Sequence, residues 1–386
     1  MYPLREQIER EIRDRGPIPF SRYMQICLYD PQLGYYSGNA EQFGKSGDFY
    51  TSSDLHAVFG RLIARQMEEI WRALDRPPKI EILELGPGRG LFARDVLHWS
   101  NKKFPDFFSA LTYYLEESSP SLRKKLEENL RDEVASGKAQ IRVREEPGAR
   151  VKAEVDGNAR GPEERPTIPF RNSSPETPRV VFANEFFDAL PVEILTVRGK
   201  LHLALEQNRL CEVWLKPQPA ELESLDRYGV HPEQNERIEV PLVAQNLVGE
   251  LAADLDRGII IVIDYGYTRE QQLAGRHRGT LMTYRNHSVS PDPYQAPGEQ
   301  DITSHVNFTA LAAACERSGM QCQSLLTQSQ FLMGIGECNE FADVFEECRL
   351  PQERAKRALQ LKHLISPEGM GETFQVLIAN RSVEAT

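Results

Sequence analysis

Short apolar runs alternate with helix-like patterns along most of the chain after residue 78. Runs typical of buried strands occupy 79–85, 110–115, 179–183 and 258–263. Apolar positions at near-helical spacing predict helices at 91–99, 120–130 and 243–256, and a last strand is expected near 373–379. Strands that alternate with helices in this way predict an α/β fold with a doubly wound sheet.

The residues before this alternating region have a different pattern. They combine helical segments with a Gly/Pro break at 16–19, and Pro77-Pro78 separates them from the first strand. We therefore expect an N-terminal helical lobe at 1–75 and a main domain at 76–386. Within the main domain we expect two insertions, an exposed segment rich in Pro, Gly, Glu, Arg and Ser at 145–178 and a β-hairpin with a helix at 192–256.

A glycine-rich turn follows the first strand of the main domain. The run ELGPGRG at 84–90 lies directly between a strand and a helix. Glycine adopts positive φ and lets a ligand approach bare backbone, and open α/β sheets bind ligands at the carboxyl ends of their strands. A tight turn without a ligand is the alternative. The candidate cofactor-binding residues here are Glu84, Gly86, Pro87, Gly88 and Gly90.

The spacing of the glycines separates classes of cofactor. A dinucleotide-binding turn would need its third glycine at position 91, which is Leu91. Gly44-Lys45-Ser46 has the ending of a phosphate-binding Walker loop but lacks the opening glycine. The turn instead resembles motif I of S-adenosyl-L-methionine (SAM) methyltransferases, whose cofactor has no phosphate.

An acidic pair, Glu116-Glu117, ends the second strand. In such folds a carboxylate at this position accepts hydrogen bonds from ribose hydroxyls, each worth about 1.5–3 kcal/mol. We expect Glu116 rather than Glu117 to take this role. The alternative is a pair of solvated acids ahead of a helix N-terminus.

Polar side chains also end the third strand, at the sheet edge where doubly wound enzymes place their reacting groups. Glu185 and Asp188 lie three residues apart on a turn and can face one pocket, so they are the candidate catalytic residues. Asn184 is expected to orient the substrate or the cofactor. Capping of a helix or turn by Asp188 and binding of a backbone amide by Glu185 are the alternatives.

The loop at 47–51 is predicted to close over the methionine end of the cofactor. Asp48 supplies a carboxylate for the ammonium group, and Thr51 supplies a hydroxyl. A turn in which Thr51 caps the following helix is the alternative.

Composition limits the classes of partner. The net charge of −11 over 386 residues disfavours nucleic acid, and the six cysteines form no C-x-x-C pair, so we expect no zinc site. Residues 1–15 mix acidic and basic side chains, and no apolar run reaches the roughly 18 residues of a membrane span. From these features we expect no membrane span and a location in the bacterial cytoplasm.

Several longer runs resemble the MidA-like family of SAM-dependent methyltransferases. They are DPQLGYYS at 30–37, GDFYTS at 47–52, ELGPGRG at 84–90, ANEFFDALPV at 183–192, IDYGY at 263–267, GTLMTYRNH at 279–287 and APGEQDITSHVNF at 296–308. The resemblance implies a Rossmann-like methyltransferase sheet with an N-terminal lobe and added substrate-binding elements. Its cofactor would be SAM, and S-adenosyl-L-homocysteine the product.

The same resemblance implies a methyl acceptor. The family includes a mitochondrial assembly factor that methylates an arginine in a subunit of respiratory complex I, so the expected partner is a protein that presents an arginine, such as a respiratory-complex subunit. Two alternatives stay open: a non-catalytic SAM-binding assembly factor and a methyltransferase acting on a small molecule. The sequence leaves the oligomeric state open, a homodimer included.

Overall fold

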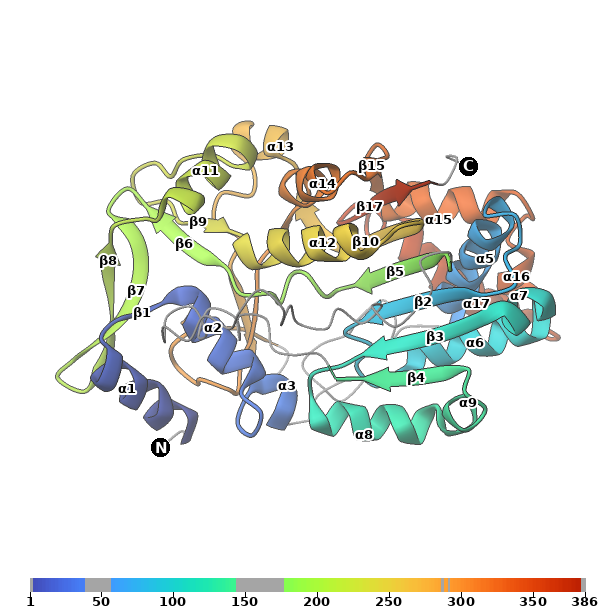
Figure 1. The fold of residues 1–386 in the computed structure, drawn as a ribbon, viewed down its shortest axis with the longest axis horizontal. Helices are drawn as coiled ribbons and strands as arrows, with labels where there is room; N and C mark the ends of the chain where they lie inside the picture. Colours follow the sequence, from blue (N-terminus) through green and yellow to red (C-terminus); the bar gives the residue numbers. More distant parts are fainter. Residues whose placement is uncertain (1–2, 39–56, 144–176, 286–287, 291, 383–386) are drawn as a thin grey trace.

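The computed structural model describes residues 3–38, 57–143, 177–285, 288–290 and 292–382. Asp48, Thr51 and residues 145–176 of the predicted insertion lie outside these ranges, so their predicted roles stay predictions. Within the described ranges the chain forms three β-sheets with helices packed on and beside them (Figure 1).

The largest sheet confirms the predicted α/β fold. Its parallel strands, in sheet order, are β4 (Ala139–Arg142), β3 (Leu111–Glu116), β2 (Ile80–Leu85), β5 (Arg179–Asn184) and β10 (Gly258–Tyr267). Antiparallel β17 (Phe374–Arg381) extends the sheet beyond β10. Three short strands pair with β10 or β17: β14 (Val306–Asn307), β15 (Gln321–Cys322) and β16 (Leu326–Thr327).

Helices cover both faces of this sheet because its strands are apolar on both sides. Ile80 and Ile82 of β2 point into one core, whereas Leu83 and Leu85 point into the other. The second core is closed by α12 (Leu242–Asp254) and α14 (Phe308–Arg317). The first is closed by α5 (Ala57–Ala73), α6 (Leu91–Lys103), α7 (Pro105–Ala110), α8 (Pro120–Asn129), α15 (Gln328–Glu337), α16 (Ala342–Phe345) and α17 (Pro351–Ile365), and α9 (Arg131–Ala135) follows α8.

A second lobe lies beside the carboxyl ends of the main strands (Figure 1). Its helices are α1 (Pro3–Arg15), α2 (Phe20–Tyr29) and α3 (Tyr35–Gly38), and they share a core with a five-stranded sheet. The strands of that sheet are β1 (Ile18–Pro19), β6 (Glu193–Thr196), β7 (Gly199–Glu206), β8 (Arg209–Leu215) and β9 (Ile238–Val240). The remaining elements are α11 (Pro219–Tyr228), α13 (Arg269–Leu273) and a small sheet of β11 (Met282–Arg285), β12 (Ser288–Val289) and β13 (Asp301–Thr303).

This packing groups the chain differently from the predicted domains. Helix α5 was placed in the N-terminal lobe, but its buried face packs on α6 and the main sheet. Helix α12 was placed in the 192–256 insertion, but it covers the main sheet next to α14. The position of α12 follows from the topology. Because β5 and β10 are parallel, the chain between them must cross back over the sheet, and α12 is part of this crossover.

The strand order fixes where a ligand site can form. From β2 the chain builds outward through β3 and β4, and then it returns to the other side of β2 for β5 and β10. The carboxyl ends of β2 and β5 therefore flank the point where the winding direction reverses. In open α/β sheets this point is the usual ligand site.

Asp343 provides a test of how α16 is held on this core. Its buried carboxylate accepts hydrogen bonds from the indole N–H of Trp99 (3.1 Å) and from Asn339 (2.6 Å), and it pairs with Arg65. We expect Asp343→Ala to lower the free energy of unfolding by about 3 kcal/mol, because Arg65 loses its buried partner. Chemical denaturation measures this difference. As a control, Glu346→Ala breaks a more exposed pair with Lys103 and should cost less than about 1 kcal/mol; equal losses would contradict this account.

Candidate functional site

The turn after β2 depends on three glycines in the left-handed region. The φ angles are +62° at Gly86, +57° at Gly88 and +72° at Gly90. A Cβ at Gly86 would lie 2.7 Å from the ring of Phe186, and one at Gly90 would lie 2.5 Å from Leu126. At Gly88 no described atom lies within 4 Å of such a Cβ. Gly86 and Gly90 are thus closely packed by side chains, whereas Gly88 leaves its backbone open to a ligand.

The carboxylate beside this turn belongs to Glu117. It accepts hydrogen bonds from the backbone N–H of Gly88 (3.2 Å) and of Ser119 (2.8 Å). Glu116 instead ends β3, where its backbone carbonyl accepts the N–H of Gly86 (3.1 Å). Of the two acids, Glu117 is thus the one whose carboxylate contacts the glycine turn, whereas the predicted binding of ribose by Glu116 stays a prediction. The chain leaves the strand after residue 116, so the next side chain is the one that turns toward the glycines.

Two buried acids lie at the base of the turn. Burial raises the pKa of Glu117 to about 7. Glu84, at the penultimate position of β2, accepts a hydrogen bond from the hydroxyl of Tyr113 (2.9 Å), and burial raises its pKa to about 8. Desolvation disfavours the ionised form of both carboxyl groups, so a ligand that donates hydrogen bonds to Glu117 would relieve part of that cost.

The loop after β5 is held by Asp264, the buried residue that follows Ile263 in β10. One oxygen of its carboxylate accepts the backbone N–H of Phe186 (3.2 Å), Phe187 (3.0 Å) and Asp188 (3.3 Å). Burial, together with the nearby carboxylates of Asp188 and Glu185, raises the pKa of Asp264. Asp264 therefore supports three consecutive amides of the loop that carries Asp188.

Asn184 and Glu185 lie at the start of this loop, next to the end of β10. The side-chain amide of Asn184 donates to the carboxylate of Glu185 (3.2 Å), and the N–H of Glu185 donates to the carbonyl of Ile263 (3.0 Å). Glu185 has φ of +51°, a left-handed conformation that is uncommon for a residue with a Cβ. Such conformations are costly and gather at functional sites, which makes Glu185 notable among the described residues.

Asp188 lies in a cluster of acids and tyrosines that come from distant segments. The hydroxyl of Tyr265 donates to Asp188, and burial raises the pKa of Asp188 to about 6. The hydroxyl of Tyr36 in α3 donates to Asp301 in β13 (2.9 Å), and Asp301 is itself buried. Burial, together with the nearby carboxylates of Asp301 and Asp188, raises the pKa of the Tyr36 hydroxyl.

Three of these cluster members were not among the predicted site residues. Tyr36, Tyr265 and Asp301 do occur in runs that carry the family resemblance, at 30–37, 263–267 and 296–308. That resemblance was the available signal, because nothing in the local spacing relates the three segments.

The N-terminal lobe connects both halves of the site. The hydroxyls of Ser119 and Ser121 donate to the backbone carbonyls of Tyr36 (2.8 Å) and Ser37 (3.1 Å). On the other side, the hydroxyl of Tyr29 donates to the carbonyl of Ala189 (2.9 Å). Helices α2 and α3 therefore contact both the segment after Glu117 and the loop that carries Asp188.

The site thus combines an open glycine turn with a buried acidic cluster at the carboxyl ends of parallel strands. A family model for S-adenosyl-L-methionine-dependent methyltransferases matches residues 62–326. The chain belongs to this family. SAM is accordingly its cofactor, and methyl transfer is its activity.

Full-length relatives agree with this assignment. A Drosophila melanogaster protein named as a mitochondrial protein arginine methyltransferase, the NDUFAF7 homolog, is 29% identical over 97% of this chain and 84% of its own length. The human protein arginine methyltransferase NDUFAF7 is 25% identical over 96% and 82%. A crystal structure from Burkholderia thailandensis, bound to S-adenosyl-homocysteine, superposes with a TM-score of 0.79 at 26% identity, covering 99% of this chain and 93% of that one.

The predicted bacterial cytoplasmic location is contradicted by these relatives. The Drosophila and human proteins are named as mitochondrial. The expectation rested on the absence of a leader-like pattern in residues 1–15, which is weak evidence for where a protein resides. Among the helices in the described ranges, none is both long and apolar enough to cross a bilayer.

The raised pKa of Glu117 predicts a pH-dependent effect of Glu117→Gln on stability. The folded protein keeps the Glu117 proton up to about pH 7, whereas the unfolded chain loses it near the ordinary value of 4.5. The folded state therefore binds more protons in this window, and the contribution of Glu117 to stability falls as pH rises. Because Gln cannot ionise, the variant does not lose this contribution as pH rises. We therefore expect the melting temperature of the variant minus that of the unsubstituted protein to increase from pH 5 to pH 8.

Thermal melting in a series of buffers measures this difference. The matching variant Glu84→Gln should show a difference that keeps increasing up to about pH 8. A difference that stays constant with pH in both variants would be incompatible with burial of these two carboxyl groups.

Proposed function

We propose that this chain transfers the methyl group of SAM to the guanidinium of an arginine in a protein substrate. The observation that carries the proposal is the buried cluster of Asp188, Asp301, Tyr36 and Tyr265 next to the glycine turn. The relatives named as protein arginine methyltransferases support the same acceptor. A respiratory-complex subunit, implied by the family resemblance, is the substrate class that we propose to test first.

The turn after β2 has the features that SAM requires. The open space at Gly88 allows the cofactor to approach the backbone, and the carboxylate of Glu117 is placed to accept hydrogen bonds from ribose hydroxyls. Gly86, Pro87 and Gly90 shape the turn, and the carbonyl of Glu116 accepts the N–H of Gly86. Glu84 precedes the turn and accepts a hydrogen bond from the hydroxyl of Tyr113. When bound, SAM supplies an electrophilic methyl group on a sulfonium ion. Asp48 and Thr51 stay predictions for the lid.

The acidic cluster suits a guanidinium. Arginine stays protonated at neutral pH and presents planar N–H donors that pair with carboxylates. Glu185 and Asp188 are proposed to hold this group in line with the methyl carbon, while Tyr265 and Tyr36 fix the carboxylates of Asp188 and Asp301 by donating their hydroxyl protons. Alignment of this kind accounts for much of the rate in bimolecular transfers.

The reaction also releases one proton. The substrate guanidinium and the methylated product each carry one positive charge, so a nitrogen must lose a proton as the new N–C bond forms. Glu185 is half-buried and Asp188 is buried with a raised pKa of about 6, so both are placed to accept it. The partial exposure of Glu185 gives the proton a route to solvent, with Asn184 holding its carboxylate.

Asp188→Asn tests the substrate half of the site. We expect kcat/KM for methyl transfer to fall at least about 100-fold, because the guanidinium loses a charge-assisted partner in a buried site. Transfer of an isotope-labelled methyl group from SAM to a mitochondrial protein extract, with mass spectrometry of modified arginines, measures the activity. Asp343→Asn is the matched control, since Asp343 is equally buried but lies in the contact between α16 and α5, and its folded fraction should keep full activity. Methylation found only on other side chains would refute the proposed acceptor.

Gly88→Ala tests the cofactor half. We expect SAM affinity to fall at least about tenfold, because the added methyl group occupies the open space and the positive φ adds strain of about 1 kcal/mol. Gly137→Ala is the control, since Gly137 also has positive φ (+75°) and open space, and it lies after α9. Calorimetric titration of SAM should show unchanged affinity for the control. Equal affinity for both variants would mean that the cofactor does not approach Gly88.

A further inference from the structure

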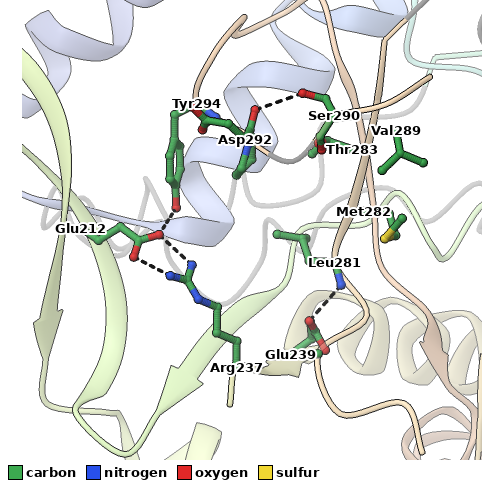
Figure 2. Close-up of a pocket in the computed structure, with 12 residues that line it drawn as sticks. Glu212, Arg237, Glu239, Leu281, Met282, Thr283, Val289, Ser290, Asp292 and Tyr294 are labelled. Carbon is green, nitrogen blue, oxygen red and sulfur yellow. Dashed lines mark hydrogen bonds and ion pairs between the residues drawn. The ribbon is translucent and has the colours of Figure 1, made fainter. Parts of the chain in front are cut away.

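A cavity of about 460 Å³ lies beside the candidate site, between the five-stranded sheet and the β11–β12 hairpin. Figure 2 shows Glu212, Arg237 and Tyr294 on one side of this cavity and Met282 and Val289 on the other. Its volume is large enough for one or two side chains of a bound polypeptide. The proposed transfer reaction, as described above, makes no use of it.

The charged groups of the cavity already have partners. Arg237 donates to both carboxylate oxygens of Glu212 (2.7 Å each), and the hydroxyl of Tyr294 donates to the same carboxylate (2.7 Å). Glu239 accepts the backbone N–H groups of Thr280 (2.9 Å) and Leu281 (3.1 Å). A ligand would therefore gain little from new ion pairs here and more from covering apolar surface.

The apolar surface of the cavity comes from Leu281, Met282 and Val289. Val289 is 57% exposed in β12, where it pairs with the half-buried Tyr284 of β11. A valine in this position leaves an apolar surface at the rim that a ligand side chain can bury. The three residues belong to the same hairpin region, so one inserted aliphatic group would contact them together.

Strand β11 connects the cavity to the acidic cluster. Tyr284 pairs with Asp301 across β11 and β13. Burial, and after it the nearby carboxylates of Asp301 and Asp188, raises the pKa of Tyr284, so its side chain lies near the cluster. Met282 lies two residues earlier on the same face of the strand. Met282 and Tyr284 are therefore about 7 Å apart along β11, the distance spanned by two residues of an extended peptide.

We infer that this cavity binds an aliphatic side chain of the protein substrate, two or three residues from the arginine that is methylated. The inference rests on the proposed function and adds a sequence preference to it. An extended substrate segment that places its arginine against Asp188 and Asp301 would run along β11, with the aliphatic side chain between Met282 and Val289.

Synthetic peptides provide the first test. One peptide carries an arginine and a leucine two or three residues away in a Gly/Ser/Lys background, and its matched partner has serine in place of the leucine. We expect the leucine peptide to have a KM for methylation at least about tenfold lower, from the burial of one aliphatic side chain. Equal KM values for both peptides would overturn the inference while leaving arginine methylation in place.

Crosslinking locates the side chain without turnover. The leucine is replaced by a diazirine-bearing photoreactive leucine, the peptide is bound in the presence of S-adenosyl-homocysteine, and crosslinked residues are mapped by mass spectrometry. Crosslinks within 281–289 support the inference, and crosslinks confined to other segments would overturn it. Crosslinks at 281–289 without methylation of any peptide would support this docking site and count against the proposed reaction alone.

A substitution at the rim completes the test. Val289→Asp places a charge where the aliphatic side chain would pack. Because Val289 is exposed, we expect the substitution to leave the fold intact. We expect the KM of the leucine peptide to rise to that of the serine peptide. Val197→Asp is the matched control, because Val197 is 60% exposed in the turn between β6 and β7, and its KM should not change. Equal effects of both substitutions would contradict binding at the β11–β12 hairpin.

Discussion

The carboxylate of Asp264 is the contact on which both halves of the site depend. It binds three consecutive backbone amides of the loop after β5 and so fixes that loop relative to β10. The fixed loop places Phe186 against Gly86 of the cofactor turn, and it directs Asp188 toward Tyr265. A buried carboxylate can carry this role because the three donors replace much of the hydration that it has lost.

The acidic cluster is costly to the free protein. Asp188, Asp264 and Asp301 are all buried. Asp188 and Asp301 accept hydrogen bonds from tyrosine hydroxyls, and Asp264 accepts hydrogen bonds from backbone amides. Tyrosines orient the carboxylates but do not neutralise them. A guanidinium that binds beside Asp188, as proposed, would stabilise the ionised form of a carboxyl group that burial otherwise disfavours.

The sequence predicted the parts of this site that are local. Apolar runs located β2, β3, β5 and β10, and the polar residues at their ends located the glycine turn and the 184–188 loop. It favoured Glu116, whereas the carboxylate that contacts the glycine turn is that of Glu117, because the direction of a side chain at a strand end depends on the residue where the pairing stops. Tyr36 and Asp301 lie 265 positions apart, and only the packing of the N-terminal lobe brings them together.

That lobe explains why the cofactor turn and the substrate cluster form one site. Ser119, two residues after Glu117, caps α8 and also donates to the carbonyl of Tyr36, whose hydroxyl donates to Asp301. A displacement of α3 would therefore alter the segment beside the carboxylate of Glu117 and the acids beside the proposed guanidinium at the same time. The geometry needed for in-line transfer, which tolerates only small errors in alignment, is set by these few hydrogen bonds between elements that are distant in the sequence.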